Sequence, residues 1–128
     1  MPFVRIDLRK GKPPAYLQEI GRIVYEALLS VGVPAHDRFQ VISEHESEAF
    51  LFDPTYLGIE RSDDLVIIQI TWNEGRTVEQ KKALYRAIAD GLSASPGVRR
   101  EDVFINLVEV KKENWSFGNG IAQYAQGG

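Results

Sequence analysis

The sequence predicts a two-layer α/β fold of the α+β kind, built from two βαβ units that follow each other along the chain. Four short stretches alternate apolar and polar residues or are nearly all apolar, as strands are, and two longer segments have apolar residues at helical spacing. The halves also share a pattern, because residues 32–39 and 97–104 both read Gly-Val, three residues, Asp, one residue, Phe. We therefore expect a single domain over residues 1–128, with its units at about residues 2–45 and 65–110.

The first unit is predicted from its alternation and its prolines. Val4, Ile6 and Leu8 lie on one face of an alternating segment that begins at residue 2, which is typical of a strand. A Gly-Lys-Pro-Pro run follows, and proline suits the first turn of a helix. Gly32 is expected to end that helix, and residues 39–45 form the second strand. The apolar stripe of the helix is Leu17, Ile20, Val24, Ala27, Leu28 and Val31.

The second unit repeats this plan. Residues 65–72 are nearly all apolar, as expected of a strand that is covered on both faces. Thr77 and Gln80 have the spacing of a capping box at the start of the second helix. Residues 103–110 form the fourth strand, and an aromatic, glycine-rich tail follows over residues 114–120.

The order of these elements predicts the topology. Each crossover between two strands of a unit should be right-handed, with its strands parallel. Four strands with two helices on one face leave the opposite sheet face bare in a single chain. A bare apolar face is a contact surface, so we expect the chain to associate.

Composition excludes several classes of function. The 128 residues carry a formal charge of -3 with both signs mixed, so no basic stripe indicates nucleic acid as a partner. Cysteine is absent, which excludes disulfides and thiolate metal sites. The sequence has no signal peptide and no membrane-spanning run, so we expect a cytoplasmic protein with no membrane partner. His36 and His45 lie near several carboxylates, but strand alternation separates the side chains, and we expect no metal.

The Met1-Pro2 start is the unusual local feature. Loss of Met1 would leave a free prolyl amine, fixed in place by the strand that follows. Burial or a nearby cation lowers the pKa of such an amine, because both disfavour the ammonium form. A neutral amine can act as a general base or as a nucleophile toward carbonyls. If Met1 is retained, Pro2 carries an amide and has neither property, and the dipeptide is an ordinary chain start.

Four stretches together resemble the tautomerase superfamily, especially its double-length branch that includes malonate semialdehyde decarboxylase. They cover essentially the whole chain when the order of elements is included. The stretches are Pro2 to Leu8, residues 32–40, residues 76–81, and the Trp-Ser-Phe-Gly-Asn-Gly tail within residues 114–120.

The resemblance implies a homotrimer, without a cofactor, in which the processed Pro2 is the catalytic group. Asp37 matches an aspartate that flanks this proline in the decarboxylase, and Arg76 matches one of two arginines. The other arginine position is Glu74 here, a departure that disfavours decarboxylation. Trp115 and Phe117 match the apolar wall over the pocket.

The residues themselves leave alternatives open. Asp37 has a repeat mate, Asp102, so both aspartates could simply cap a turn. The mate of Arg76 is Lys12, so a cation before each helix could be a feature of the unit. Glu74 could lie on the surface or pair with Arg76. Trp115 and Phe117 could belong to the core or to an interface.

These readings give three hypotheses of function. The first is keto–enol tautomerisation of a small 2-oxo acid, a carbonyl substrate bearing a carboxylate, with Pro2 as general base and acid. Arg76 would hold the carboxylate, Asp37 would assist, and Trp115 and Phe117 would keep the pocket dry. The second is a malonate-semialdehyde-type decarboxylase or hydratase. The third is a non-catalytic trimeric module that binds a partner.

Overall fold

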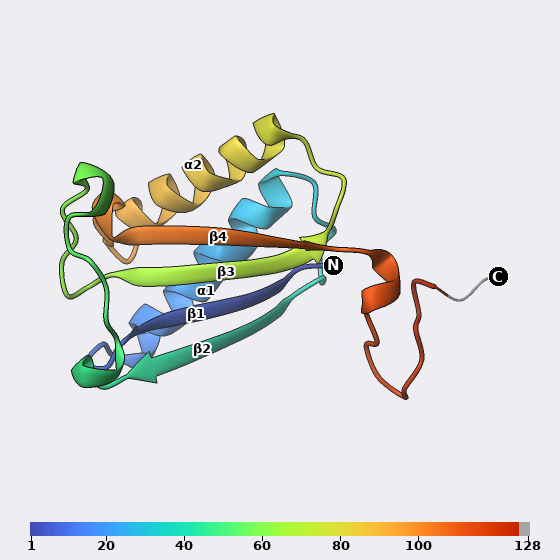
Figure 1. Ribbon diagram of the computed structural model, residues 1–128, viewed down its shortest axis with the longest axis horizontal. Coiled ribbons are helices and arrows are strands. Elements are labelled where there is room, and N and C mark those ends of the chain that lie inside the picture. The colour runs from blue at the N-terminus through green and yellow to red at the C-terminus, as the bar shows by residue number, and fades with distance from the viewer. Residues whose placement is uncertain (126–128) are drawn as a thin grey trace.

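The computed structural model describes residues 1–125; residues 126–128, which the single predicted domain includes, lie outside the described part. One four-stranded sheet carries two helices on one face, as Figure 1 shows. This confirms the predicted two-layer fold and its tandem βαβ plan. The elements are β1 (Phe3–Arg9), α1 (Pro14–Ser30), β2 (Phe39–His45), β3 (Val66–Asn73), α2 (Val78–Ala94) and β4 (Val103–Val110).

The pairing of the strands brings distant parts of the chain together. The strand order is β2-β1-β3-β4, and each unit pairs its own two strands in parallel. The central pair, β1 and β3, is antiparallel, with Phe3 opposite Thr71. The start of β1 and the end of β3 therefore meet at one edge of the sheet. Pro2 and the turn before α2 approach each other for this reason.

The core fills the space between the sheet and the helices. Val4, Ile6 and Leu8 of β1 are buried, as their alternation predicts. Burying such side chains stabilises the fold by roughly 1.5–3 kcal/mol each relative to leaving them exposed. The largest fully buried side chains include Trp72, Ile20, Leu28, Ile68, Ile70, Leu84, Ile88 and Leu92.

Local sequence signals set the helix ends. The helix α1 has proline at its start and ends at Ser30, one residue before the last residue of the predicted stripe. Gly32 follows with φ of 100°, a conformation that glycine adopts without steric cost. Thr77 and Gln80 form the predicted capping box of α2.

The two helices pack closely at a glycine. A Cβ atom placed on Gly91 of α2 would lie 2.6 Å from Cγ2 of Ile23 on α1. Only a residue without a side chain allows the helices this separation. The two helices therefore form one closely packed layer.

The opposite face of the sheet is open in the single chain, as expected when both helices lie on one face. Ile67 is half-buried and Gln69 is exposed on this face of β3. Within the single chain, β3 is covered on one face only, because both helices lie on the same side of the sheet. Within residues 1–125, no helix has the length and apolar character needed to cross a membrane. The exposed apolar side chains on the outer strands are Phe39, Val41, Phe104 and Val108.

Candidate active site

The candidate site lies at the end of the sheet where β1 begins. A cavity of about 290 Å³ opens there, and Pro2, Phe39, Trp115 and Phe117 are among the residues that line it. Pro2 is buried although it precedes the first strand by one residue. The hydrogen-bonded strand therefore holds this proline beside a largely apolar cavity.

Asp37 lies beside the start of the chain. Its Oδ2 is 3.6 Å from the α-amino nitrogen of Met1, and both side chains are largely buried. Its Oδ1 is also buried and has no hydrogen-bond partner within the described part of the chain. Buried polar atoms normally have partners. The free acceptor is thus available to a donor group on a ligand or on the chain terminus.

The repeat mate of Asp37 has a different environment. Asp102 is fully buried, and its oxygens accept hydrogen bonds from the backbone N–H of Ser62 at 2.7 Å and from its hydroxyl at 2.5 Å. Asp102 therefore anchors the connection between the two units. No comparable side-chain cap is found for Asp37 within residues 1–125, so the two aspartates share a position in the repeat but not a set of contacts.

Arg76 ends the turn that follows β3. Its Nη1 donates a hydrogen bond to the carbonyl oxygen of Asn73 at 2.9 Å, and its guanidinium carbon lies 4.1 Å from the centroid of the Trp72 ring. The side chain is half-buried, and in the part of the chain that the structure describes no carboxylate lies within salt-bridge distance of it. Burial lowers the pKa of Arg76, while the negative charges of Asp37 and Glu109 oppose this shift. Arginine stays protonated at neutral pH, so a charged, positioned donor faces this end of the sheet.

The nearby carboxylates do not neutralise Arg76 by contact. Glu109 forms an ion pair with Lys81, and this hydrogen bond is the main reason why the pKa of Glu109 lies below its usual value. Glu74 is exposed and makes no ion pair with Arg76 in the described structure. The alternative in which Glu74 pairs with Arg76 is therefore not found.

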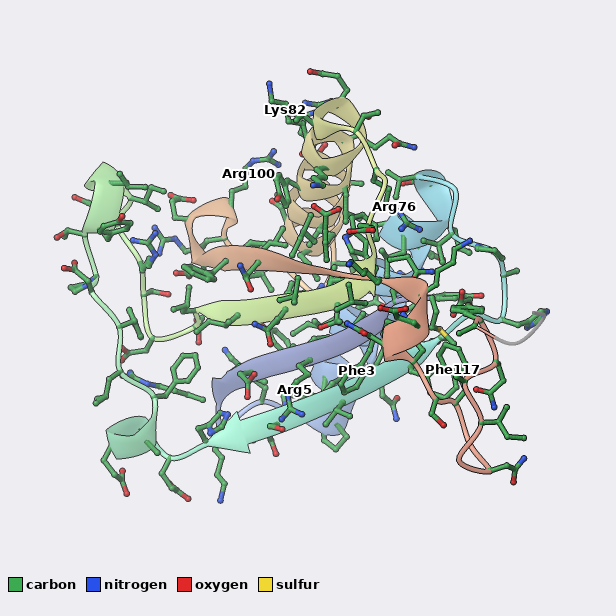
Figure 2. The ribbon with its side chains drawn as sticks, turned by 45° about the vertical axis from the view of Figure 1, so that its right-hand side comes forward. Phe3, Arg5, Arg76, Lys82, Arg100 and Phe117 are labelled. Carbon is green, nitrogen blue, oxygen red and sulfur yellow. The ribbon has the colours of Figure 1, made fainter. Side chains whose placement is uncertain are left out.

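The tail after β4 supplies an aromatic wall. The rings of Trp115 and Phe117 stack with centroids 5.4 Å apart, and Tyr124 packs edge-on against Phe117 at 4.9 Å. The indole Nε1–H of Trp115 donates a hydrogen bond to Oδ1 of Asn73 at 2.8 Å. Figure 2 shows Arg76 and Phe117 at the same end of the sheet. This wall lies over the cavity that contains Pro2.

Burial and the charge of Asp37 both affect the pKa of Tyr124. Partial burial, and then the Asp37 carboxylate, raise the pKa of Tyr124 above its ordinary value. The phenol therefore keeps its proton at neutral pH and can donate it in a hydrogen bond. Neither Tyr124 nor Asn73 was predicted from the sequence. A third aromatic residue in the glycine-rich tail was a usable signal for Tyr124, whereas a single asparagine at a strand end gave none.

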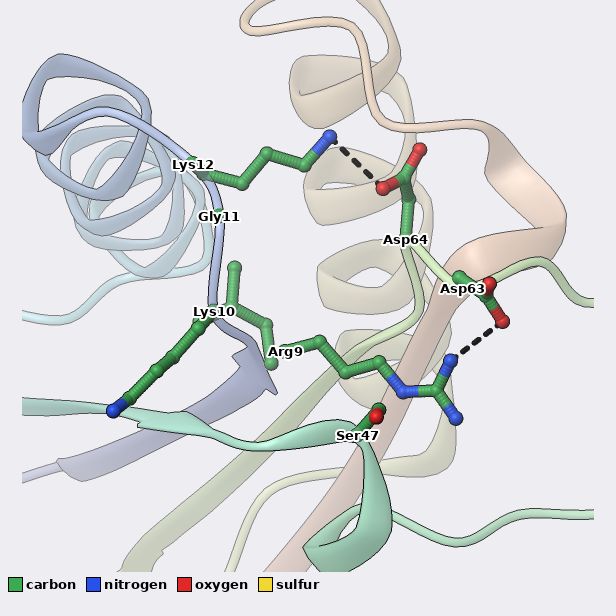
Figure 3. A pocket seen from close by; sticks show the side chains of 8 residues that line it. Arg9, Lys10, Gly11, Lys12, Ser47, Asp63 and Asp64 are labelled. Carbon is green, nitrogen blue, oxygen red and sulfur yellow. Dashed lines mark ion pairs between the residues drawn. The ribbon is translucent and has the colours of Figure 1, made fainter.

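The opposite end of the sheet carries Lys12, the repeat mate of Arg76, and its cations are paired with carboxylates. A second cavity of about 300 Å³ lies there, lined by Arg9, Lys12, Asp63 and Asp64 among others (Figure 3). Nζ of Lys12, the mate of Arg76, is 2.8 Å from Oδ1 of Asp64, and Nη1 of Arg9 is 2.6 Å from Oδ1 of Asp63. The cations at this end are already paired with carboxylates of the same chain, unlike Arg76.

The structure thus brings the predicted site residues to one end of the sheet. Pro2, Trp115 and Phe117 line one cavity, Asp37 lies beside the N-terminus, and the charge of Asp37 acts on Arg76. Their catalytic roles remain predictions.

His36 and His45 make contacts within the fold and do not form a metal site in the described residues. Nε2 of His45 lies 2.6 Å from Oδ1 of Asp7, and the ring stacks on Phe50 with centroids 5.7 Å apart. The backbone N–H of His36 donates to the hydroxyl of Tyr25. Within residues 1–125, no group of three or more His, Cys, Asp or Glu side chains has an arrangement that could hold a metal ion.

Comparisons with known proteins agree with this fold. Residues 37–118 match the family model described as tautomerase enzyme. The chain is 48% identical over 124 residues to a probable tautomerase, YusQ, of Bacillus subtilis strain 168, covering 96% of this chain and 98% of that protein.

Two solved structures are similar over nearly the whole chain. The FG41 malonate semialdehyde decarboxylase, inhibited by 3-bromopropiolate, is 38% identical with a TM-score of 0.88, covering 95% of this chain and 93% of that one. A second malonate semialdehyde decarboxylase is 31% identical with a TM-score of 0.88, covering 95% of both chains.

Tandem βαβ units on one sheet and these matches define the class as enzymes of the tautomerase type. The chain belongs to the tautomerase family.

Proposed function

We propose that this protein catalyses keto–enol tautomerisation of a small 2-oxo acid, with the amine of Pro2 as general base and acid after removal of Met1. The observation that carries the proposal is the half-buried Arg76, which has no carboxylate partner in the described structure while its repeat mate Lys12 is paired with Asp64. A guanidinium left free at one end of a pseudo-repeat is suited to an anionic ligand.

Pro2 is the proposed proton-transfer group. The residue is buried, and burial disfavours the ammonium form of its amine. The positive charge of Arg76 acts in the same direction, whereas the negative charge of Asp37 acts against it. The neutral amine takes the proton from the enol hydroxyl and then gives a proton to the neighbouring carbon, so the substrate gains a keto group and loses no atoms. A positioned base of this kind contributes about 10²–10⁴-fold in rate.

Arg76 and Asp37 are proposed to handle charge. Arg76 binds the carboxylate of the substrate and stabilises negative charge that develops on the adjacent oxygen. Asp37 has a free acceptor oxygen near the amine and holds a proton or a water molecule there. No cofactor takes part in these steps.

The aromatic wall is proposed to exclude water. Trp115 and Phe117 cover the cavity that contains Pro2. A water-poor site strengthens the interaction between Arg76 and the charge on the substrate.

We further propose that the working form is a homotrimer. The open face of the sheet exposes apolar side chains, including Phe39 and Phe104, at 55% and 43%. Covering these side chains with second and third copies of the chain would remove apolar surface from water. Light scattering tests this proposal: a mass of three chains is expected, and a monomer at micromolar concentration would contradict it.

A second candidate is decarboxylation or hydration of malonate semialdehyde. Two similar solved structures, at 31% and 38% identity, are malonate semialdehyde decarboxylases, and one is described with decarboxylase and hydratase activities and with a variant whose first proline is replaced by alanine. Glu74 stands against this candidate, because it places a carboxylate where the resemblance implies a second arginine.

One assay separates the candidates. Ketonisation of an aryl enolpyruvate is followed for the wild type, Pro2→Ala and Arg76→Ala, alongside turnover of malonate semialdehyde. The proposal expects ketonisation that both substitutions reduce strongly. Unchanged ketonisation in both variants would exclude the mechanism. Turnover of malonate semialdehyde with negligible ketonisation would establish the second candidate, and no activity in either assay would favour a binding module.

A further inference from the structure

We propose that Asn73 is a positioning residue: its side chain holds the aromatic tail closed over the Pro2 cavity, and its backbone holds Arg76. The inference rests on the proposed function, since it concerns the affinity of that same site for its substrate. It assigns a role to a residue that neither touches the reacting atoms nor lines the cavity.

The first observation is the position of Asn73. It is the last residue of β3 and pairs with Val110, the last residue of β4. The ladder continues for one more bond, from the N–H of Glu74 to the carbonyl oxygen of Val110 at 2.9 Å. Asn73 is thus attached to the most regular part of the fold, and its side chain has a rigid base.

The second observation is that Asn73 contacts both sides of the site. Its carbonyl oxygen accepts a hydrogen bond from Nη1 of Arg76 at 2.9 Å. Its side-chain Oδ1 accepts a hydrogen bond from Nε1 of Trp115 at 2.8 Å. Both bonds are partly buried, where loss of a partner is more costly than at an exposed position. One residue therefore fixes the proposed carboxylate-binding group relative to the aromatic wall.

The third observation concerns how the tail is attached. Within residues 1–125, the bond between Trp115 and Asn73 is the one hydrogen bond found between residues 111–125 and the rest of the chain. The other hydrogen bonds of the tail stay inside it, such as the pair that links Gln123 to Phe117 and Gly118. No ion pair joins the two parts in the same range. The polar attachment of the tail thus depends on a single acceptor.

These observations predict what loss of the acceptor does. The indole stacks on Phe117, which in turn packs against Tyr124, so the three rings move as one group. Without Oδ1 of Asn73, the indole N–H of Trp115 has no acceptor on the protein and can form a hydrogen bond only with water, which requires the side chain to move outward. The wall then opens more often, and the substrate dissociates more readily. The chemical step itself changes little, because Pro2 is held by β1.

Asn73→Leu is the main variant, since leucine has a similar size and no acceptor. We expect KM to rise about fivefold to tenfold, as for the loss of one partly buried hydrogen bond, with kcat within about twofold. Gln18→Leu, at an exposed position of α1, is the control and should leave both constants unchanged. Asn73→Asp keeps an acceptor and should keep the tail closed. It nonetheless raises KM, because its charge competes with the substrate for Arg76.

Two readouts do not depend on activity. Exchange of the Trp115 indole proton, followed by nuclear magnetic resonance, should be at least tenfold faster in Asn73→Leu and close to wild type in Asn73→Asp. Trypsin cleavage after the exposed Lys111 or Lys112 should accelerate in Asn73→Leu only. These readouts separate the proposed role of Asn73 from the catalytic proposal. If Asn73 holds the tail through Trp115, both changes should appear even in a protein that has no tautomerase activity.

A double-mutant cycle completes the test. Trp115→Phe keeps a ring and removes the donor, so Asn73→Leu should add almost nothing to KM in that background. Additive effects of the two substitutions, or unchanged indole exchange in Asn73→Leu, would overturn the proposal. A fall in kcat equal to the rise in KM would also overturn it, because the residue would then act on the chemical step.

Discussion

Oδ2 of Asp37 lies 3.6 Å from the α-amino nitrogen of Met1. The carboxylate is thus aimed at the start of the chain, one residue away from the proposed catalytic nitrogen of Pro2. Its repeat mate Asp102 instead accepts two hydrogen bonds from Ser62 and one from Arg99. Equivalent positions of the two units therefore have different roles: Asp102 anchors the connection between the units, and Asp37 lies beside the N-terminus.

Asp37→Asn should change the pH dependence of tautomerisation. The Asp37 carboxylate stabilises the ammonium form of a Pro2 amine and so raises the pKa of that amine; its removal lowers the pKa. Since the neutral amine is the active base, the acid limb of the kcat/KM profile should move to lower pH by about 0.5–1 unit. Glu74→Gln is the control, because this exposed carboxylate has no such contact. An acid limb that stays in place, or moves to higher pH, would argue against an Asp37–Pro2 interaction.

Substitution of Arg76 should act mainly on substrate binding. Arg76→Ala removes a charge-assisted contact with the carboxylate of the substrate, which is worth about 1.5–3 kcal/mol, so KM should rise roughly 10-fold to 150-fold. Arg76→Lys should recover only part of this loss, since lysine cannot keep the bond to Asn73 and bind the carboxylate in a bidentate way. Arg86→Ala, at an exposed position of α2, is the matched control. Steady-state kinetics measure all three variants, and a KM of Arg76→Ala close to wild type would contradict the assigned role.

Asp102 should matter for stability far more than Asp37. Asp102→Ala leaves two partly buried donors of Ser62 without their acceptor, so we expect the free energy of unfolding to fall by about 2–4 kcal/mol. Asp102→Asn should lose less, because its carbonyl oxygen still accepts one bond. Asp37→Ala should lose under about 1 kcal/mol. Urea unfolding followed by circular dichroism measures these values, and equal losses for both alanine variants would refute the division of roles.

The sequence predicted the elements better than their arrangement. Local signals placed the strands within one residue, and the Thr77–Gln80 capping box is formed as expected. The two-layer fold with both helices on one face is confirmed. The antiparallel pairing of β1 with β3 was not predicted, because pairing between units depends on contacts that no local pattern records.

The site was predictable only in part, for physical reasons. Arg76 and Trp115 were found because their residue types and positions matched a family pattern. Asn73 was missed because its role comes from two hydrogen bonds that no sequence pattern records: a local one from Arg76, and one from Trp115 that exists only after the tail folds back onto the sheet. The environments of Asp37 and Asp102 could not be distinguished from the sequence either. Asp37 lies beside the amine of Met1, whereas Asp102 accepts hydrogen bonds from Ser62, and both partners are distant in sequence.

A free amine of Pro2 is the proposed chemical group of the site, and the retention or loss of Met1 decides whether it exists. Expression with and without an inhibitor of methionine aminopeptidase yields forms that intact mass distinguishes by the presence of Met1, and their ketonisation rates are compared at equal folded concentration. We expect the form without Met1 to carry the activity and the form with Met1 to be at least about 100-fold slower, because an amide nitrogen is not basic. Equal activity of the two forms would contradict it.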